Sequence, residues 1–398
     1  MKTFIQTAAQ DIARALFDSY DSFKAGEITS CRFTQTDMLN WLRPFQEQDQ
    51  FTTMPLGMSG EGRSISLYAI GKGSTKVMLW SQMHGDEPTA TMALVDIFNF
   101  LSKNPDHVLT KTIQEKLTVL AIPMLNPDGA ERFTRRTAQL IDLNRDALAL
   151  ETPEARILKE TCSKYQPEYG FNLHDQDTRM TVGTTKKITA IALLAPATDE
   201  TRSDNPVRAR AKKVASMVAQ MLNLFIPGYL AKWDDTFEPR AFGDNIQKWG
   251  TSTVLVESGG WKGDPDKFFI RKLNCIALLT TLYTIATGES AQANTKIYEQ
   301  IPINMKLGCD HIIRSAVLQT NNQTAPFRVD IGINFESRKS GSTGLLEQIA
   351  TIVDIGDLST FTALEQDVDA HGAELDANRI KLDHSFSSNE LPLLLKQS

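Results

Sequence analysis

The sequence of 398 residues predicts an α/β protein whose mixed, largely parallel sheet has helices on both faces, followed by a small β-rich module. Up to about residue 290, short apolar runs alternate with segments whose apolar residues recur every three or four positions. This alternation is typical of strands joined through helices, which form sheets buried on both faces. Beyond residue 300, apolar and polar residues alternate strictly, which indicates half-buried strands.

These patterns divide the chain into three regions. We expect an N-terminal helical segment over 1–50, an α/β domain over 51–290 and a β-rich C-terminal module over 300–398. The first region predicts an amphipathic helix and then a helix around Thr36–Leu42 that stops at Pro44. In the last region, Phe327–Phe335 and Ile301–Leu307 both follow the two-residue period of a strand.

The central region predicts its elements from apolar periodicity and from the glycines and prolines that interrupt it. Strands are expected at Phe51–Met58, Ser64–Ile70, Lys76–Gln82, Leu117–Pro123, Tyr169–Leu173, Ile188–Leu194 and Thr253–Val256. Helices are expected from Asp86 to about Lys103 and at Pro153–Tyr165, Asn205–Leu222 and Pro265–Ala286.

Composition excludes several classes of protein. The net charge of −6 without a basic block argues against a nucleic-acid partner. The 4 cysteines lie far apart and form no Cys-x-x-Cys pair, so we expect free thiols and a cytoplasmic location. The N-terminus lacks the apolar core of a signal peptide, and no uncharged apolar run is long enough for a membrane span. A homo-oligomer is left open.

Titratable residues follow three of the predicted strands: His84 and Glu87, then His174, then Glu257. The carboxyl ends of parallel strands meet at one edge of a sheet, where α/β proteins place their sites. An imidazole and a carboxylate three residues apart suit zinc, and a catalytic zinc takes three protein ligands. His174 is the candidate third ligand and Glu257 the candidate base. Taken alone, His174 also fits a hydrogen-bonded core histidine, and Glu257 a carboxylate that stabilises a helix N-terminus.

The order of short motifs extends this pattern. His84-Gly-Asp-Glu87 is followed by Asn126-Pro-Asp-Gly129, by Thr134-Arg135, by Asp142-Leu-Asn144-Arg145, and then by His174 and Glu257 after strands. With these motifs, residues of about 50–290 resemble the zinc carboxypeptidase family of metallopeptidases, which includes murein peptide amidases.

The resemblance implies a zinc carboxypeptidase-like fold and a role for each matching residue. His84, Glu87 and His174 would bind Zn²⁺, and Glu257 would be general base and then acid toward a zinc-bound water. Arg135 would stabilise the oxyanion, with Arg136 as the alternative one position along. Asn144 and Arg145 would bind a free carboxylate of the substrate, and Asp142 would orient His84.

Two departures from the family pattern bear on the substrate. The stretch 240–249 has no tyrosine where the peptidases carry one, and Tyr229 lies upstream. Asp146 follows Arg145 where the family usually has asparagine. Arg240 and Lys248 favour an acidic side chain on the substrate.

The resulting prediction is a zinc metallocarboxypeptidase that cleaves an amide next to a free carboxylate and removes C-terminal residues from small peptides. The alternative is an N-acyl amino acid deacylase of the aspartoacylase or succinylglutamate desuccinylase type. A third interpretation, from a different class, is a non-catalytic binding protein with a relic site.

Overall fold

The computed structural model describes residues 7–319, 325–339 and 346–394. The chain folds into two compact units, which are described separately. The first unit comprises Met1–Asp177, Ala190–Gly259 and Asp264–Asn304, and the second comprises Thr178–Thr189, Gly260–Gly263 and Met305–Ser398. Two short segments from the middle of the chain therefore group with the C-terminal residues, and the sequence pattern gives no indication of this.

An eight-stranded mixed sheet forms the centre of the first unit, in the order β1-β2-β4-β3-β5-β9-β7-β8. The strands are β1 (Phe51–Met58), β2 (Ser64–Ile70), β3 (Thr75–Ser81), β4 (Leu117–Ile122), β5 (Tyr169–Asp175), β7 (Ile191–Leu194), β8 (Leu230–Lys232) and β9 (Ser252–Ser258). The four central strands β4, β3, β5 and β9 are parallel. The pairs β1–β2, β2–β4 and β9–β7 are antiparallel, and β8 runs parallel to β7. The predicted mixed sheet is confirmed.

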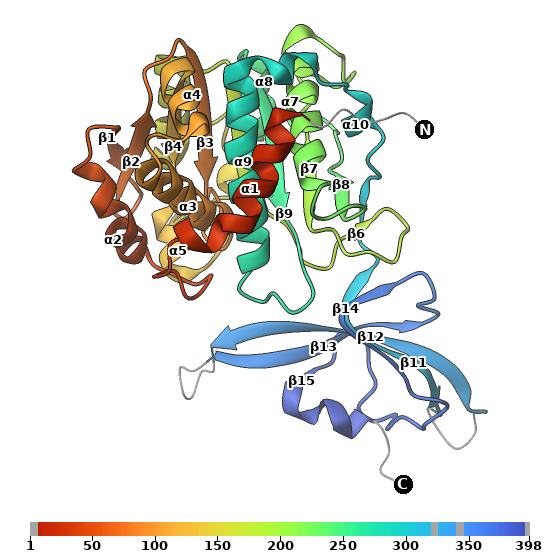
Figure 1. Ribbon diagram of the computed structural model, residues 1–398. Helices are drawn as coiled ribbons and strands as arrows, with labels where there is room; N and C mark the ends of the chain where they lie inside the picture. Colours follow the sequence, from red (N-terminus) through yellow and green to blue (C-terminus); the bar gives the residue numbers. More distant parts are fainter. Residues whose placement is uncertain (1–6, 320–324, 340–345, 395–398) are drawn as a thin grey trace, which may run out of the picture. The chain divides into compact units, whose positions relative to one another are not determined.

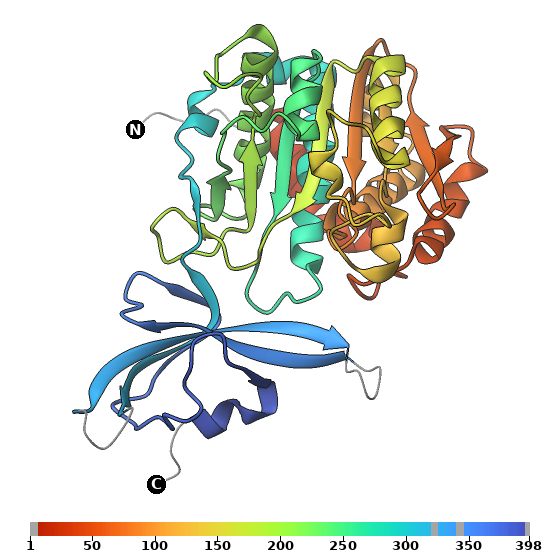
Figure 2. The same cartoon turned by 180° about the vertical axis from the view of Figure 1, so that it is seen from behind.

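Helices cover both faces of this sheet (Figures 1 and 2). They are α1 (Ala8–Phe23), α2 (Gln35–Gln46), α3 (Thr89–Lys103), α4 (Val108–Lys116), α5 (Pro127–Arg132), α6 (Pro153–Tyr165), α7 (Pro206–Leu222), α8 (Phe242–Lys248), α9 (Phe268–Thr287) and α10 (Lys296–Glu299). α9 contacts α1, α3, α4 and α7 on one face of the sheet. α6 and α8 contribute to the apolar cluster on the other face.

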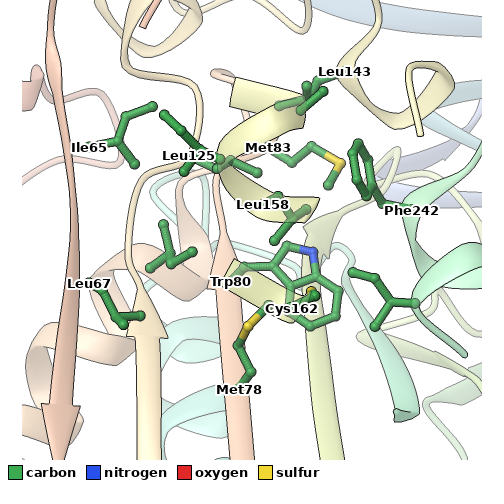
Figure 3. Packing of buried hydrophobic residues seen from close by; sticks show 14 of the residues in the cluster. Ile65, Leu67, Met78, Trp80, Met83, Leu125, Leu143, Leu158, Cys162 and Phe242 are labelled. Carbon is green, nitrogen blue, oxygen red and sulfur yellow. The ribbon is translucent and has the colours of Figure 1, made fainter. Parts of the chain in front are cut away.

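The apolar cluster explains why the buried interiors of β2, β3 and β4 carry no charge. Ile65 and Leu67 of β2 and Met78 and Trp80 of β3, each two residues apart, point to the same face (Figure 3). There they pack with the α6 and α8 side chains Leu158, Phe242 and Ile246. The intervening residues Val77, Leu79, Val119 and Ala121 are buried on the opposite face. Because both faces of these strands are buried, the side chains that point to either face must be apolar.

Helix boundaries follow capping side chains more closely than apolar periodicity. Thr152 and Asn205 each accept a backbone N–H bond at the N-termini of α6 and α7, next to a proline in the first turn. The predicted end of the second helix at Pro44 is wrong, because α2 continues to Gln46. Pro44 lies in the last turn of α2, so its missing N–H removes only one backbone bond near the end of the helix. The sequence pattern also missed α4, α5, α8 and β8, which are short.

α9 has the length and composition of a membrane span, but 83% of its most apolar 18-residue window is buried inside the fold. Its buried residues face α1, α3, α4 and α7. It therefore occupies the place of a core helix, as the sequence pattern predicts.

The second unit contains a five-stranded sheet in the order β14-β11-β12-β13-β15. Its strands are β11 (Gly308–Leu318), β12 (Phe327–Lys339), β13 (Leu346–Gly356), β14 (Thr362–Asp369) and β15 (Ser385–Ser387). Ile331, Ile333 and Ile352 form its core, so the predicted alternation over Phe327–Phe335 is confirmed. The alternation over Ile301–Leu307 yields only the two-residue β10 (Asn304–Met305), since Ile303 and Met305 are exposed.

Candidate active site

Three neighbouring parallel strands bring the predicted site residues to one edge of the sheet. β3, β5 and β9 are adjacent, and His174 of β5 lies opposite Glu257 of β9 in the strand register. His84 and Glu87 follow β3 in the loop that leads into α3. The sheet order thus gathers residues from positions 84 to 257 of the chain.

The loop that carries His84 and Glu87 rests on the loop that carries the Asn-Pro-Asp-Gly motif. A Cβ at Gly85 would lie 1.9 Å from the carbonyl carbon of Gly129, so the two backbones meet without room for a side chain. Asn126 fixes the second loop, because its Oδ1 accepts a bond of 2.9 Å from the Gly129 N–H. The two motifs therefore form one rigid support for the site.

His84, Glu87 and His174 form a buried cluster whose potential ligand atoms lie within 4.8 Å of one another. The Nδ1 atoms of His84 and His174 lie 2.6 Å from Glu87 Oε1 and Oε2, respectively. Burial would raise the pKa of Glu87, but the two imidazoles hold it below its ordinary value. Two imidazole nitrogens and one carboxylate make the donor set of a catalytic zinc site, so the residues present fit the ion.

Asp142 connects this cluster to Arg135. Its Oδ1 lies 3.1 Å from His84 Nε2, which is the contact predicted to orient that imidazole. Its Oδ2 accepts bonds of 3.1 and 3.0 Å from Nε and Nη2 of Arg135. Nη1 of Arg135 in turn lies 3.1 Å from His84 Nδ1. Arg136 instead donates to the Leu140 carbonyl, so Arg135 is the arginine that reaches the cluster.

Asp175 is a supporting residue that the sequence reasoning missed. Its backbone N–H donates to Glu87 Oε2 at 3.1 Å, and its side chain pairs with Lys267 Nζ at 3.1 Å. Thr89 Oγ1 donates at 2.6 Å to Asp175 Oδ2, the same oxygen that pairs with Lys267. Its position directly after His174 was the available signal, because neighbours of a ligand commonly hold the partner residues in place.

All seven predicted site residues line one cavity of about 260 Å³. They are His84, Glu87, Arg135, Asn144, Arg145, His174 and Glu257. The cavity walls also include Asn172, Gln176, Leu194, Pro196, Trp233, Asp234, Glu238, Gly243, Asp244 and Leu255, none of which was predicted as a site residue.

The predicted carboxylate clamp lies at the side of this cavity. The Asn144 side chain accepts a bond of 2.9 Å from the Phe242 N–H through Oδ1, which leaves its Nδ2 to donate to a ligand. Arg145 Nη1 donates to the Asn144 carbonyl at 2.7 Å, and its Nε lies 3.5 Å from Glu238 Oε2. The guanidinium therefore keeps further N–H groups for a carboxylate.

Glu257 is a buried carboxylate that lies near the acidic residues Glu87 and Asp175. Its side-chain Oε2 is buried and has no hydrogen-bond partner within the described ranges. Burial raises the pKa of Glu257 well above its ordinary value, and the nearby charge of Glu87 adds to the increase. A bound dication would oppose both effects. Because Glu257 lines the cavity, its carboxylate can take up a proton there.

The structure does not support the predicted role of Arg240 and Lys248, because neither residue lines the cavity. Arg240 pairs with Glu238 through bonds of 2.9 and 2.8 Å, and Lys248 is exposed on α8. Tyr229 also lies outside the cavity lining, where the loop residues Trp233 and Glu238 are found instead.

Asp244 should make stability depend on pH. Burial raises the pKa of Asp244 to about 6, from 3.8 when unfolded, so the folded state holds its proton more tightly. Ionisation therefore costs stability as the pH rises from 3.8 through 6. The stability gained by Asp244→Asn should be about 1 kcal/mol larger at pH 7.5 than at pH 5, because one pKa unit corresponds to about 1.4 kcal/mol. Urea unfolding at both pH values measures this difference, and an equal gain at both would contradict it.

Part of this chain is similar in sequence to known proteins. The family model described as "Zinc carboxypeptidase" matches residues 38–173, which contain the first five site residues and end one residue before His174. A protein named "Probable carboxypeptidase 2" from Arthroderma benhamiae is 27% identical over 164 residues, covering 40% of this chain and 30% of its own length. "Carboxypeptidase 2" from Trichophyton rubrum is 28% identical over 164 residues, which again cover 40% of this chain and 30% of its own length. The match thus spans about a third of these relatives.

Solved structures show the same fold. A metallo-carboxypeptidase from Burkholderia cenocepacia superposes with a TM-score of 0.52 at 16% identity, covering 65% of this chain and 70% of its own. Carboxypeptidase A from Helicoverpa armigera gives a TM-score of 0.51 at 14% identity, with coverages of 71% and 81%. The fold is therefore that of the metallo-carboxypeptidases. With the family match, this confirms the resemblance to the zinc carboxypeptidase family predicted from the sequence motifs.

Proposed function

We propose that this chain is a zinc metallocarboxypeptidase, which hydrolyses the amide next to a free carboxylate and removes C-terminal residues from small peptides. One observation carries the proposal. A buried His-Glu-His cluster, a carboxylate with a free oxygen and an Asn-Arg pair line a single cavity. A relic binding site would be expected to lack at least one of these parts.

The chain's own residues divide the reaction between them. A zinc ion held by His84, Glu87 and His174 would supply Lewis acidity toward the carbonyl and toward water. Glu257 takes a proton from the attacking water while the oxygen of that water bonds to the scissile carbonyl carbon. The Arg135 guanidinium, beside His84, stabilises the negative charge that develops on the carbonyl oxygen. Glu257 then passes the proton to the leaving nitrogen as the C–N bond breaks.

Binding of the substrate carboxylate orients the reacting amide. A guanidinium pairs with a carboxylate through two parallel bonds, and Asn144 Nδ2 supplies a third donor beside it. These contacts fix the distance between the carboxylate and the scissile carbonyl, so binding energy is converted into orientation. A small peptide or N-acyl amino acid as the substrate and a cytoplasmic location stay predictions.

A second candidate is an N-acyl amino acid deacylase of the aspartoacylase or succinylglutamate desuccinylase type. It is favoured by the lack of a tyrosine among the cavity-lining residues within the described ranges. Such an enzyme would use the same ligands, base and clamp on an acylated amino acid.

A mixed library of peptides and N-acyl amino acids separates these candidates. The zinc-loaded protein is incubated with the library, and products are identified by mass spectrometry, with chelator-treated protein as the control. Loss of single C-terminal residues supports the carboxypeptidase. Release of acyl groups with peptides untouched supports the deacylase, and zinc-bound protein that changes neither set argues against both.

Replacing Arg145 with glutamine tests the carboxylate clamp. We expect kcat/KM for peptides with a free C-terminus to fall about 30- to 100-fold, because charge-assisted bonds to the carboxylate are lost. Most of the loss should appear in KM. Arg136→Gln is the matched control, since Arg136 is exposed and bonds only to the nearby Leu140 carbonyl among the described contacts. Equal losses in the two variants would exclude the clamp.

A further inference from the structure

We propose that Asp244 and Asn172 form a subsite for a positively charged side chain, an ammonium or a guanidinium, on the residue whose carboxylate Arg145 binds. This inference rests on the proposed function, because the clamp determines which residue of the substrate enters the cavity. It reverses the preference for an acidic side chain inferred from Arg240 and Lys248.

Asp244 is a buried carboxylate without an ion pair among the described residues, although the nearby charge of Arg145 partly opposes the rise that burial causes in its pKa. It is the third residue of α8, lines the cavity and is only 7% exposed. Among the described residues, its side chain accepts one hydrogen bond, from the Glu238 N–H to Oδ1 at 3.2 Å. No lysine or arginine of the described chain lies within ion-pairing distance of it.

Two other carboxylates at the cavity are already neutralised. Glu238 forms the two bonds to Arg240 and lies near Arg145. Asp175 pairs with Lys267. Asp234, also at the cavity, is exposed to solvent and accepts bonds from Thr236. Asp244 differs from all three, since it is both buried and unpaired with a cation.

Asn172 supplies a second and independent acceptor. It is 2% exposed, and its Oδ1 is buried without a hydrogen-bond partner within the described ranges. It lies two residues before His174 in β5, so both side chains point to the same face of the strand. Asn172 packs against α8 at Gly243, because a Cβ at Gly243 would lie 3.2 Å from Asn172 Nδ2. Glycine at this position therefore lets the Asn172 amide lie next to the helix turn that carries Asp244.

These features fit a long cationic side chain. The buried Asp244 carboxylate lacks a paired cation and the buried Asn172 Oδ1 lacks a donor, and the burial of each group costs free energy until such a partner reaches it. Burial raises the pKa of Asp244 to about 6, a cost that a cation beside it would offset. Leu194, Pro196 and Leu255 in the cavity wall can pack against the methylene stem of lysine or arginine. An acidic side chain would be repelled by Asp244.

Matched peptides test the subsite. Zinc-loaded protein is assayed on peptides that differ only in a C-terminal lysine, arginine, norleucine or glutamate. We expect wild-type kcat/KM to favour lysine or arginine over norleucine at least 10-fold, and glutamate to be the poorest. Asp244→Asn keeps the acceptor for the Glu238 N–H and removes only the charge. It should lower the lysine-to-norleucine ratio at least 10-fold.

Glu154→Gln is the matched control. Glu154 is also a buried carboxylate in the first turn of a helix, it accepts one backbone bond from Gly60 at 2.9 Å, and burial raises its pKa. It lies outside the cavity lining, so its replacement should leave the selectivity ratio unchanged. Equal shifts in both variants, or a wild type that prefers norleucine or glutamate, would overturn the inference while the carboxypeptidase proposal stands.

Binding of the free amino acids separates the inference from the proposed function. Calorimetry with zinc-loaded protein should show lysine or arginine binding at least 10-fold tighter than norleucine, with the preference lost in Asp244→Asn. If no peptide is cleaved, the proposed function fails, and this binding preference alone decides the inference. Equal binding of lysine and norleucine would then refute it.

Discussion

Replacing Glu257 with glutamine is expected to lower kcat about 10³-fold while the protein keeps its zinc. General acid–base catalysis contributes roughly 10²- to 10⁴-fold, and here one carboxylate would both accept and return the proton. Glutamine has nearly the same shape but cannot take up the proton. Glu257 is not part of the His84, Glu87 and His174 cluster, so the metal content should not change.

Zinc content by elemental analysis and turnover of a C-terminal lysine peptide are measured on the same preparations. Glu154→Gln controls for the removal of a buried carboxylate elsewhere in the fold, and it should retain most of the wild-type kcat. A Glu257→Gln variant that keeps more than a tenth of the wild-type kcat would show that another group moves the proton.

The predictability of Glu257 and its partners has a simple physical origin. Parallel strands buried on both faces leave their carboxyl ends as one of the few places where charge meets the sheet. His174 and Glu257 are the penultimate residues of β5 and β9, so an apolar run followed by a titratable residue marked each of them. The sequence pattern did not contain the strand order β3-β5-β9, which is what brings these ends together.

Asp244 and Asn172 illustrate what sequence reasoning missed. Asn172 lies inside an apolar strand, where its amide resembles any buried polar group, and Asp244 lies in a helix of 7 residues without a clear period. Only the packing of α8 against β9 and β5 shows that both line the cavity. Arg240 misled the prediction for the same reason, since its partner Glu238 cannot be read from spacing.

A buried network of hydrogen bonds around Asp96 is another feature that sequence reasoning missed. This residue interrupts the apolar stripe of α3 and is completely buried. It accepts bonds from Tyr20 Oη at 2.5 Å, from the Ala25 N–H at 2.8 Å and from Arg271 Nε and Nη2 at 2.7 and 2.6 Å. One carboxylate thus joins α3 to α1, to the segment that follows α1 and to α9.

Asp96→Ala is therefore expected to lower the free energy of unfolding by about 3–5 kcal/mol, the usual cost of removing one partner from a buried ion pair. The cost arises mainly because Arg271, 3% exposed at its side chain, would keep its charge without a counter-charge. The double variant Asp96→Ala/Arg271→Met should then lose less stability than Asp96→Ala alone. Urea unfolding of both measures this, and Asp106→Ala, at an exposed pair with Lys111, should change little. If the double variant lost more stability than Asp96→Ala alone, the stabilisation would come from the separate contacts of each residue and not from the pairing of their charges.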